Sequence, residues 1–253
     1  MIKPLKILNG LEDEEIIEPI EKMPLTVPSK NTSAKFKLVG PFQGMEITRS
    51  HILILGGTNT GKSTLFINIL KHNRDLFNEI FIVCPTLDSQ DLLKGIVDNR
   101  HQIGPGEVED FFESLIVEQK KPINKSRYVC VILDDVIGSV KFRSQTFDRL
   151  ITGGRHSRIS LFIVSQDLMK ISAIIRQNVS VCFVTKIRDR SMQGLYDMCG
   201  FNTFRSFSEF MNQNMKNYQV IKFNLSAGYD TDSSVQVFKP PVLTKKIRFT
   251  VAN

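Results

Sequence analysis

The chain has 253 residues, a hydrophobic content of 42% and a formal net charge of +7 at pH 7. This is the composition of an ordinary globular protein with enough apolar residues for a sizeable core, in one large α/β domain or two small ones. It excludes a membrane helix, because no stretch approaches the roughly 20 apolar residues that such a helix needs, and the N-terminus has no signal-peptide pattern, so we expect an intracellular protein.

The chain divides into three parts by composition. Residues 1–35 contain an acidic cluster and four prolines without a sustained apolar period, which predicts an extended arm or linker, with disorder as the alternative. Residues 36–238 carry the pattern of a folded domain, and two short strands are expected around a turn in residues 35–47. Residues 239–253 form a basic tail without an acid. The basic excess is compatible with a polyanionic partner such as DNA, and equally with a solvated face that binds nothing.

Short continuous apolar runs recur from residue 51 onward, with helical stretches between them. Such runs are typical of strands buried on both faces of a parallel sheet, and their alternation with helices implies right-handed crossovers. We therefore expect an α/β fold with a mostly parallel sheet, helices on both faces and antiparallel additions at one edge. The expected strands are His51–Leu55, Ile80–Cys84, Tyr128–Leu133, Leu161–Val164, Val181–Val184, Tyr218–Leu225 and Val235–Phe238, and the expected helices are Ser63–His72, Val108–Gln119, Gln145–Ile151, Leu168–Arg176 and Asp189–Met198.

The first apolar run leads into a glycine-bearing loop, and residues 52–64 read ILILGGTNTGKST. The segment fits the phosphate-binding pattern GxxxxGK[ST] without a mismatch, between a strand and a helix. Backbone amides of such a loop wrap nucleotide phosphates, and the following helix points its positive end at them. Lys62 would reach the outer phosphates, and the Ser63 hydroxyl would ligate magnesium. We expect ATP and Mg²⁺ to bind at Gly56, Gly57, Thr58, Asn59, Thr60, Gly61, Lys62, Ser63 and Thr64.

A second motif is YVCVILDDV, residues 128–136, in which an apolar strand runs into two acids. This is the Walker B arrangement, which places a carboxylate beside the phosphate loop. Asp134 would hold the magnesium through its water shell, and Asp135 would polarise the attacking water. Because neighbouring strand residues point to opposite faces, Asp135 can do so only if the backbone bends at the end of the strand. The alternative for Asp135 is a helix or loop cap.

A third strand, SLFIVSQ at residues 160–166, ends in a polar pair. Gln166 would touch the γ-phosphate or its water if this strand lies between the phosphate-loop strand and the Walker B strand. Strand insertion of this kind separates the motor ATPases from the GTPase and kinase class. The alternative is that Gln166 is a surface turn residue.

Two arginines, Arg155 and Arg158, lie in the glycine-bearing segment that leads into the Gln166 strand. An arginine there could be supplied across a subunit boundary to a neighbour's γ-phosphate, where it would neutralise developing charge. Arg155 is the first candidate for this finger. Contact with DNA phosphates, or simple solvation of the loop, are the alternatives.

Three motifs in order, GGTNTGKST, then ILDD, then GGRH before a strand ending in SQ, resemble the FtsK-HerA superfamily of DNA-pumping ATPases. They are most similar to the genome-packaging ATPases of poxviruses, other large double-stranded DNA viruses and virophages. The resemblance, over roughly residues 45–190, implies a RecA/ASCE-type P-loop NTPase that forms a homo-oligomeric, hexameric ring. Such a ring moves double-stranded DNA into a preformed capsid, with a capsid or portal component as partner. It would work in the host cytoplasm or viral factory, or with the virion. The resemblance also implies that Lys62 and Ser63 bind nucleotide and metal, that Asp134 and Asp135 are the Walker B pair, that Gln166 is the polar sensor and that Arg155 is the finger.

The leading functional hypothesis is therefore a Mg²⁺-dependent ATPase that packages viral DNA. The alternatives are a nucleotide-switched binding scaffold that does not hydrolyse ATP, and a nucleoside or nucleotide kinase. A packaging motor must accept any sequence, so its DNA contacts should be basic groups that meet phosphates. The candidates are Lys141, Arg143, Arg149, Lys186, Arg188, Arg190, Lys239, Lys245, Lys246 and Arg248, each with a merely solvated side chain as the alternative.

Overall fold

The computed structural model describes residues 5–7, 47–87, 93, 95–136, 144–216, 218–226, 235–243 and 249–251. The strands expected within residues 35–47 fall outside these ranges except for Ile47, which is buried. Five of the candidate DNA contacts also lie outside the described residues: Lys141, Arg143, Lys245, Lys246 and Arg248.

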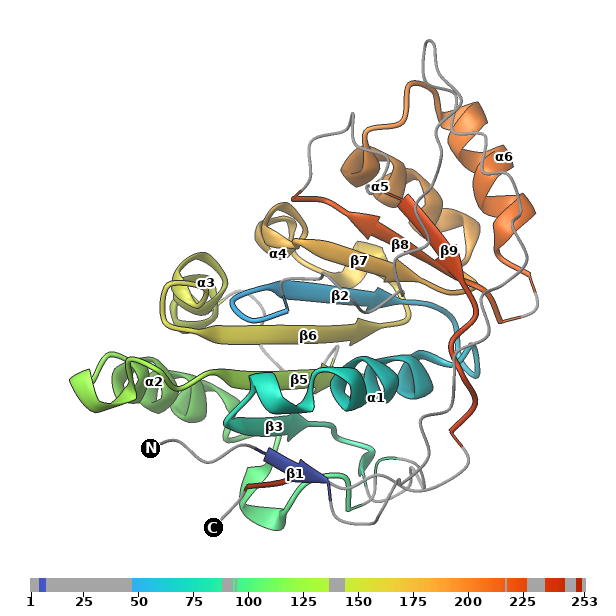
Figure 1. Cartoon of the computed structure of the whole chain (residues 1–253). Helices are drawn as coiled ribbons and strands as arrows, with labels where there is room; N and C mark the ends of the chain where they lie inside the picture. Colours follow the sequence, from blue (N-terminus) through green and yellow to red (C-terminus); the bar gives the residue numbers. More distant parts are fainter. Residues whose placement is uncertain are drawn as a thin grey trace.

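One eight-stranded sheet forms the centre of the described structure, in the order β4-β3-β5-β6-β2-β7-β8-β9 (Figure 1). The strands from β4 to β7 are parallel, and β8 and β9 join antiparallel at one edge. This confirms the predicted fold class. The strands are β2 (His51–Leu55), β3 (Glu79–Val83), β4 (Gln102–Ile103), β5 (Val129–Asp134), β6 (Ile159–Ser165), β7 (Val181–Val184), β8 (Val220–Asn224) and β9 (Val235–Phe238).

Every residue of the four central strands β5, β6, β2 and β7 is buried, as their continuous apolar sequences predict. Helix α1 packs with one apolar cluster on one face of the sheet, and the remaining long helices pack with a second cluster on the other face. The sheet is therefore covered on both sides, which places ligand-binding groups at its strand ends. The helices are α1 (Lys62–His72), α2 (Val108–Gln119), α3 (Gln145–Gly153), α4 (Ala173–Asn178), α5 (Asp189–Cys199) and α6 (Phe204–Asn214).

The structure differs from the sequence prediction in the helices near the end of the sheet. The helix expected over 168–176 is two pieces, a 3₁₀ turn η5 (Leu168–Lys170) and α4. The break has a local cause: Ile171 and Ser172 are extended, and the Asp167 side chain accepts a hydrogen bond from Met169 N, which starts a short turn of its own. Helix α6 was not predicted at all.

Two short strands at the ends of the described chain, β1 (Leu5–Ile7) and β10 (Phe249–Val251), pair antiparallel with each other. Phe249 is buried in the apolar cluster on the α1 face, and its backbone N–H donates to the Ile96 carbonyl. The predicted arm and tail thus each contribute a strand to one small ladder. Among the described residues, no helix has the length and apolar character needed to cross a membrane.

Candidate active site

The phosphate loop begins where β2 leaves the sheet and ends at α1, whose first residue is Lys62. Two positions have left-handed backbone, Asn59 (φ 58°) and Gly61 (φ 89°), and glycine adopts this conformation without strain. Gly56 has no room for a side chain, because a Cβ there would lie 1.7 Å from Thr185 Oγ1. The glycines of the motif therefore fit the loop for two different steric reasons.

Two neighbouring strands hold the loop in place. Gly56 N–H donates to the Ser165 carbonyl at the end of β6 (3.0 Å). On the other side, Gly57 N–H donates to the Lys186 carbonyl (2.8 Å), and the Thr60 and Thr185 hydroxyls lie 2.7 Å apart. The loop is thus tied to the segments that follow β6 and β7.

Strand β6 lies between β2 and β5, which is the arrangement that the expected role of Gln166 requires. In this register Asp134 at the end of β5 stands beside Val164, one residue before the end of β6. Asp134 is buried (4% exposed), whereas Asp135 is exposed and has φ 52°. The left-handed turn at Asp135 is the bend that lets both neighbouring carboxylates serve one site.

A chain of side-chain hydrogen bonds crosses the site from the phosphate loop to the acid pair. Thr58 Oγ1 donates to Gln166 Oε1 (3.0 Å), and Gln166 Nε2 donates to Asp135 Oδ1 (3.4 Å). Gln166 is therefore not an isolated surface turn residue. Its amide is oriented by partners on both sides, so a water beside Asp135 would also lie beside this amide.

Lys62 is the cation of the site. Its Nζ donates to the Gly57 carbonyl (2.7 Å), which holds the ammonium over the loop. Burial lowers the pKa of Lys62 from its ordinary value, while the negative charges of Asp134 and Asp135 act in the opposite direction. The two carboxylates thus favour the charged form of Lys62.

These residues enclose a pocket of about 360 Å³, which we call the nucleotide pocket. It is in the size range of small-molecule sites, which begins at roughly 300 Å³. Of the predicted binding residues, Gly56, Gly57, Thr60, Gly61 and Thr64 build the loop and the helix start around it. Its walls are Thr58, Asn59, Lys62, Ser63, Thr86, Asp134, Asp135, Val164 and Gln166.

Arg155 does not belong to this pocket. It precedes β6, whose amino end lies at the edge of the sheet opposite the phosphate loop (Figure 1). Seven strand residues separate the two edges, or roughly 20 Å at about 3.3 Å per residue. The Arg155 guanidinium donates to the Asn178 carbonyl at the end of α4. Arg155 therefore cannot reach the phosphate loop of its own chain in this arrangement.

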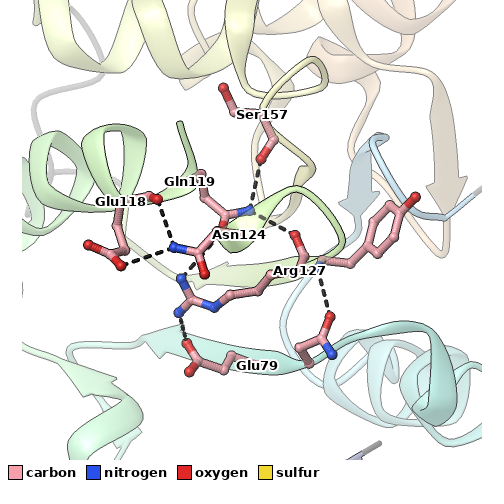
Figure 2. A network of polar contacts seen from close by, with 8 residues as sticks. Glu79, Glu118, Gln119, Asn124, Arg127 and Ser157 are labelled. Atoms are coloured by element: carbon pink, nitrogen blue, oxygen red, sulfur yellow. Dashed lines mark hydrogen bonds and ion pairs between the residues drawn. The ribbon is translucent and has the colours of Figure 1, made fainter. Parts of the chain in front are cut away.

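The loop that carries Arg155 is fixed at both of its ends. Gln119, buried at the end of α2, donates through Nε2 to the carbonyls of Arg127 (2.9 Å) and Ser157 (2.8 Å) (Figure 2). At the other end, His51 Nε2 lies 2.7 Å from the Ile151 carbonyl. Only a protonated nitrogen can pair with a carbonyl, so Nε2 is the donor.

Three residues that complete the carboxyl edge of the sheet were not predicted from the sequence. Thr86 lines the nucleotide pocket, Thr185 contacts the phosphate loop, and Lys170 lines a neighbouring cavity. Thr86 and Thr185 had a readable signal, since each is a hydroxyl residue within three residues of the end of a strand. Lys170 had none, because the expected helix over 168–176 gave it no particular direction.

Comparison with known protein families places residues 45–222 in the family described as Poxvirus A32 protein. The chain belongs to that family. The match covers well over half of the sequence and includes the phosphate loop, both aspartates, Gln166 and Arg155. The resemblance to poxvirus packaging ATPases expected from the motifs is thereby confirmed.

Solved structures with this fold include viral packaging enzymes. B204, the DNA-packaging ATPase from Sulfolobus turreted icosahedral virus, is 18% identical with a TM-score of 0.56, over 78% of this chain and 100% of B204. The genome-packaging NTPase B204 from Sulfolobus turreted icosahedral virus 2, in complex with AMPPCP, is 16% identical with a TM-score of 0.56, over 77% of this chain and 99% of that one. At these identities the likeness shows a shared fold. The comparison with curated protein sequences gave no match.

Proposed function

We propose that the protein hydrolyses ATP with Mg²⁺ and uses the reaction to move double-stranded DNA into a viral capsid. The observation that carries this proposal is the insertion of β6 between β2 and β5, which joins Gln166 to Thr58 and Asp135. A loop that only bound phosphates would not require this assembly. Membership of the Poxvirus A32 protein family, and the shared fold with B204, support the packaging role.

The donor atoms of the site suit Mg²⁺. Ser63 offers a hydroxyl and Asp134 a buried carboxylate in the same pocket, and both are the oxygen ligands that this ion prefers. No group of three or more His, Cys, Asp or Glu residues that could hold a metal occurs in the described ranges. Mg²⁺ commonly takes one or two protein ligands and completes its shell with water and nucleotide phosphates. Bound there, it would neutralise phosphate charge.

The remaining side chains divide the chemistry between them. Lys62 binds the outer phosphates, and Asp135 with Gln166 orients a water toward the γ-phosphorus. The water oxygen bonds to that phosphorus as its bond to the β,γ-bridging oxygen breaks, which gives ADP and inorganic phosphate. Asp135 accepts the proton of the water and returns it to solvent.

A head-to-tail ring would complete the site. In such a heterologous interface the amino edge of one subunit's sheet can face the carboxyl edge of the next. Arg155 then meets the γ-phosphate bound by the neighbouring subunit, and there it stabilises charge in the transition state. This explains why an arginine so far from its own phosphate loop lies on a loop that Gln119 and His51 fix at both ends.

ATP hydrolysis measured against protein concentration, duplex DNA and salt tests the proposal. We expect the rate per subunit to rise with assembly and with DNA, and the DNA effect to weaken as salt increases. Lys62→Ala should abolish turnover. Arg155→Ala subunits, mixed with wild type, should reduce the rate more than dilution alone, whereas exposed Arg205→Ala on α6 serves as the matched control. A rate indifferent to both DNA and protein concentration would remove the motor, and tight ATP binding without phosphate release would favour the nucleotide-switched scaffold.

The kinase alternative is disfavoured by the strand order. In the GTPase and kinase class the phosphate-loop strand and the Walker B strand are neighbours, whereas here β6 separates β2 from β5.

A further inference from the structure

A second cavity, of about 250 Å³, borders the nucleotide pocket, and we call it the basic pocket. The two share Asp135 and Gln166 as a common wall. The nucleotide pocket lies toward α1, whereas the basic pocket is lined by residues that surround η5 and the start of α5, which pack on the opposite face of the sheet. Its walls are Gly57, Asp135, Gln166, Asp167, Lys170, Arg188 and Arg190.

The charges around this pocket leave two cations for a ligand. Arg190 is ion-paired with Asp167, a buried carboxylate that also receives hydrogen bonds from Met169 N and Ser191 Oγ. Arg190 is therefore engaged in holding η5 to α5. Within the described ranges, the exposed side chains of Lys170 and Arg188 form neither an ion pair nor a hydrogen bond.

We propose that the basic pocket binds the inorganic phosphate released by hydrolysis, with Lys170 and Arg188 as its cations. This rests on the proposed ATPase function and adds to it a site for the second product. ADP in the nucleotide pocket would block the cleaved phosphate from leaving on its own side. The phosphate would instead pass Asp135 and Gln166, which border both pockets, and the two unpaired cations beyond them attract a dianion.

The size of the pocket suits this ligand. A water molecule takes about 30 Å³ of the liquid, so the basic pocket has room for a phosphate ion with several waters. A double helix cannot enter such a space, although a single backbone phosphate could touch its mouth. Contact of these cations with DNA is the alternative that the experiment distinguishes.

The pocket is also mechanically connected to the phosphate loop. Arg188 lies on the segment after β7, whose Lys186 carbonyl accepts from Gly57 N–H and whose Thr185 hydroxyl contacts Thr60. A phosphate ion that draws Arg188 inward would act on the same segment that supports the loop. Release of the phosphate ion can thus affect the phosphate loop that holds the nucleotide.

The experiment measures binding of inorganic phosphate to the protein already saturated with Mg²⁺ and ADP, by calorimetry, and in parallel inhibition of ATP hydrolysis by phosphate. Loss of one charge-assisted hydrogen bond corresponds to about a tenfold loss of affinity or more. We therefore expect the double variant Lys170→Ala, Arg188→Ala to bind phosphate at least about tenfold more weakly, with ADP affinity unchanged. Lys216→Ala, an exposed cation that does not line the pocket, should bind phosphate as wild type does.

Unchanged phosphate binding in the double variant would overturn the proposal. If the double variant instead loses only the stimulation by DNA, the two cations contact DNA and the pocket does not hold the product. The measurement of phosphate binding does not depend on ATP hydrolysis, so the phosphate site and the ATPase function can be rejected independently. Suppose that the wild-type protein binds phosphate beside ADP, that the double variant does not, and that neither hydrolyses ATP. This result would support the phosphate site and reject the proposed ATPase function.

Discussion

At the scale of single residues, the site depends on one unusual backbone conformation. Asp135 has a left-handed φ of 52°, and this turn brings its carboxylate next to that of Asp134 in the nucleotide pocket. The tandem acids were readable from the sequence. The turn was not, because aspartate occurs in this conformation only occasionally and the tertiary hydrogen bonds of the strand end select it.

Asp135→Asn is the sharpest test of Asp135 as the proposed base, since asparagine tolerates the left-handed conformation and cannot accept the proton. We expect turnover to fall by roughly 10²–10⁴-fold, the usual contribution of a general base, while ATP binding is retained. Steady-state phosphate release and equilibrium binding of a fluorescent ATP analogue measure the two quantities. Turnover close to that of wild type would show that Asp135 is a cap and that another group activates the water.

At the scale of elements, the sequence predicted the strands better than the connections between them. The strands β2, β7 and β9 have the predicted bounds, and β5 and β6 differ at their ends, because fully buried strands have continuous apolar sequences. Helix α6 was missed although Phe207, Phe210 and Met211 have helical spacing and Thr203 caps it. Ser and Asn recur among its remaining residues and have modest helix propensity, so packing against the sheet decides its structure.

In the candidate site, too, local features could be predicted and long-range contacts could not. Local motifs were enough to place Lys62, Ser63 and Asp134, because a strand, a turn and a helix fix them within a few residues. The link from Thr58 through Gln166 depends on strands that pair across more than a hundred residues. Such a contact becomes visible only when the strand order is known.

Gln119→Leu tests how strongly α2 holds the loop that carries Arg155. The change leaves two partly buried carbonyls, those of Arg127 and Ser157, without their donor, so we expect a loss of about 2–3 kcal/mol in the free energy of unfolding. Urea denaturation measures it. Lys121→Ala removes only an exposed ion pair with Glu118 and should leave the free energy of unfolding nearly unchanged. Equal losses in the two variants would mean that water replaces the Gln119 amide.

At the scale of the whole molecule, buried histidines make stability depend on pH. His51 is fully buried, and burial is the main cause that lowers its pKa from 6.5 to about 4; the Ile151 carbonyl acts against this, and Arg155 adds to it. Burial lowers the pKa of His101 as well. Below pH 6.5 these histidines are therefore protonated in the unfolded chain while they stay neutral in the folded chain.

Stability should accordingly be highest above about pH 7 and fall as the pH drops from 6.5 toward 4. His51 alone contributes a loss of about 2 kcal/mol by pH 5. We expect His51→Gln to show a smaller difference in the free energy of unfolding between pH 7.5 and pH 5, measured by urea titration. His156→Gln, in an exposed position, should retain the wild-type difference. An unchanged difference in His51→Gln would place the acid sensitivity elsewhere.

The position of β2 in the middle of the sheet determines when the nucleotide site can exist. Strand β2 is synthesised early, yet its two neighbours in the sheet are β6 and β7. Ile52 can therefore pair with Phe162 and Val181 only after both of those strands have been synthesised. Pairings this far apart in sequence form slowly and late, because the long connecting loop must close first. A growing chain therefore has no supported phosphate loop until residue 186 has been made. Only a chain whose sheet is almost finished therefore has a formed nucleotide pocket.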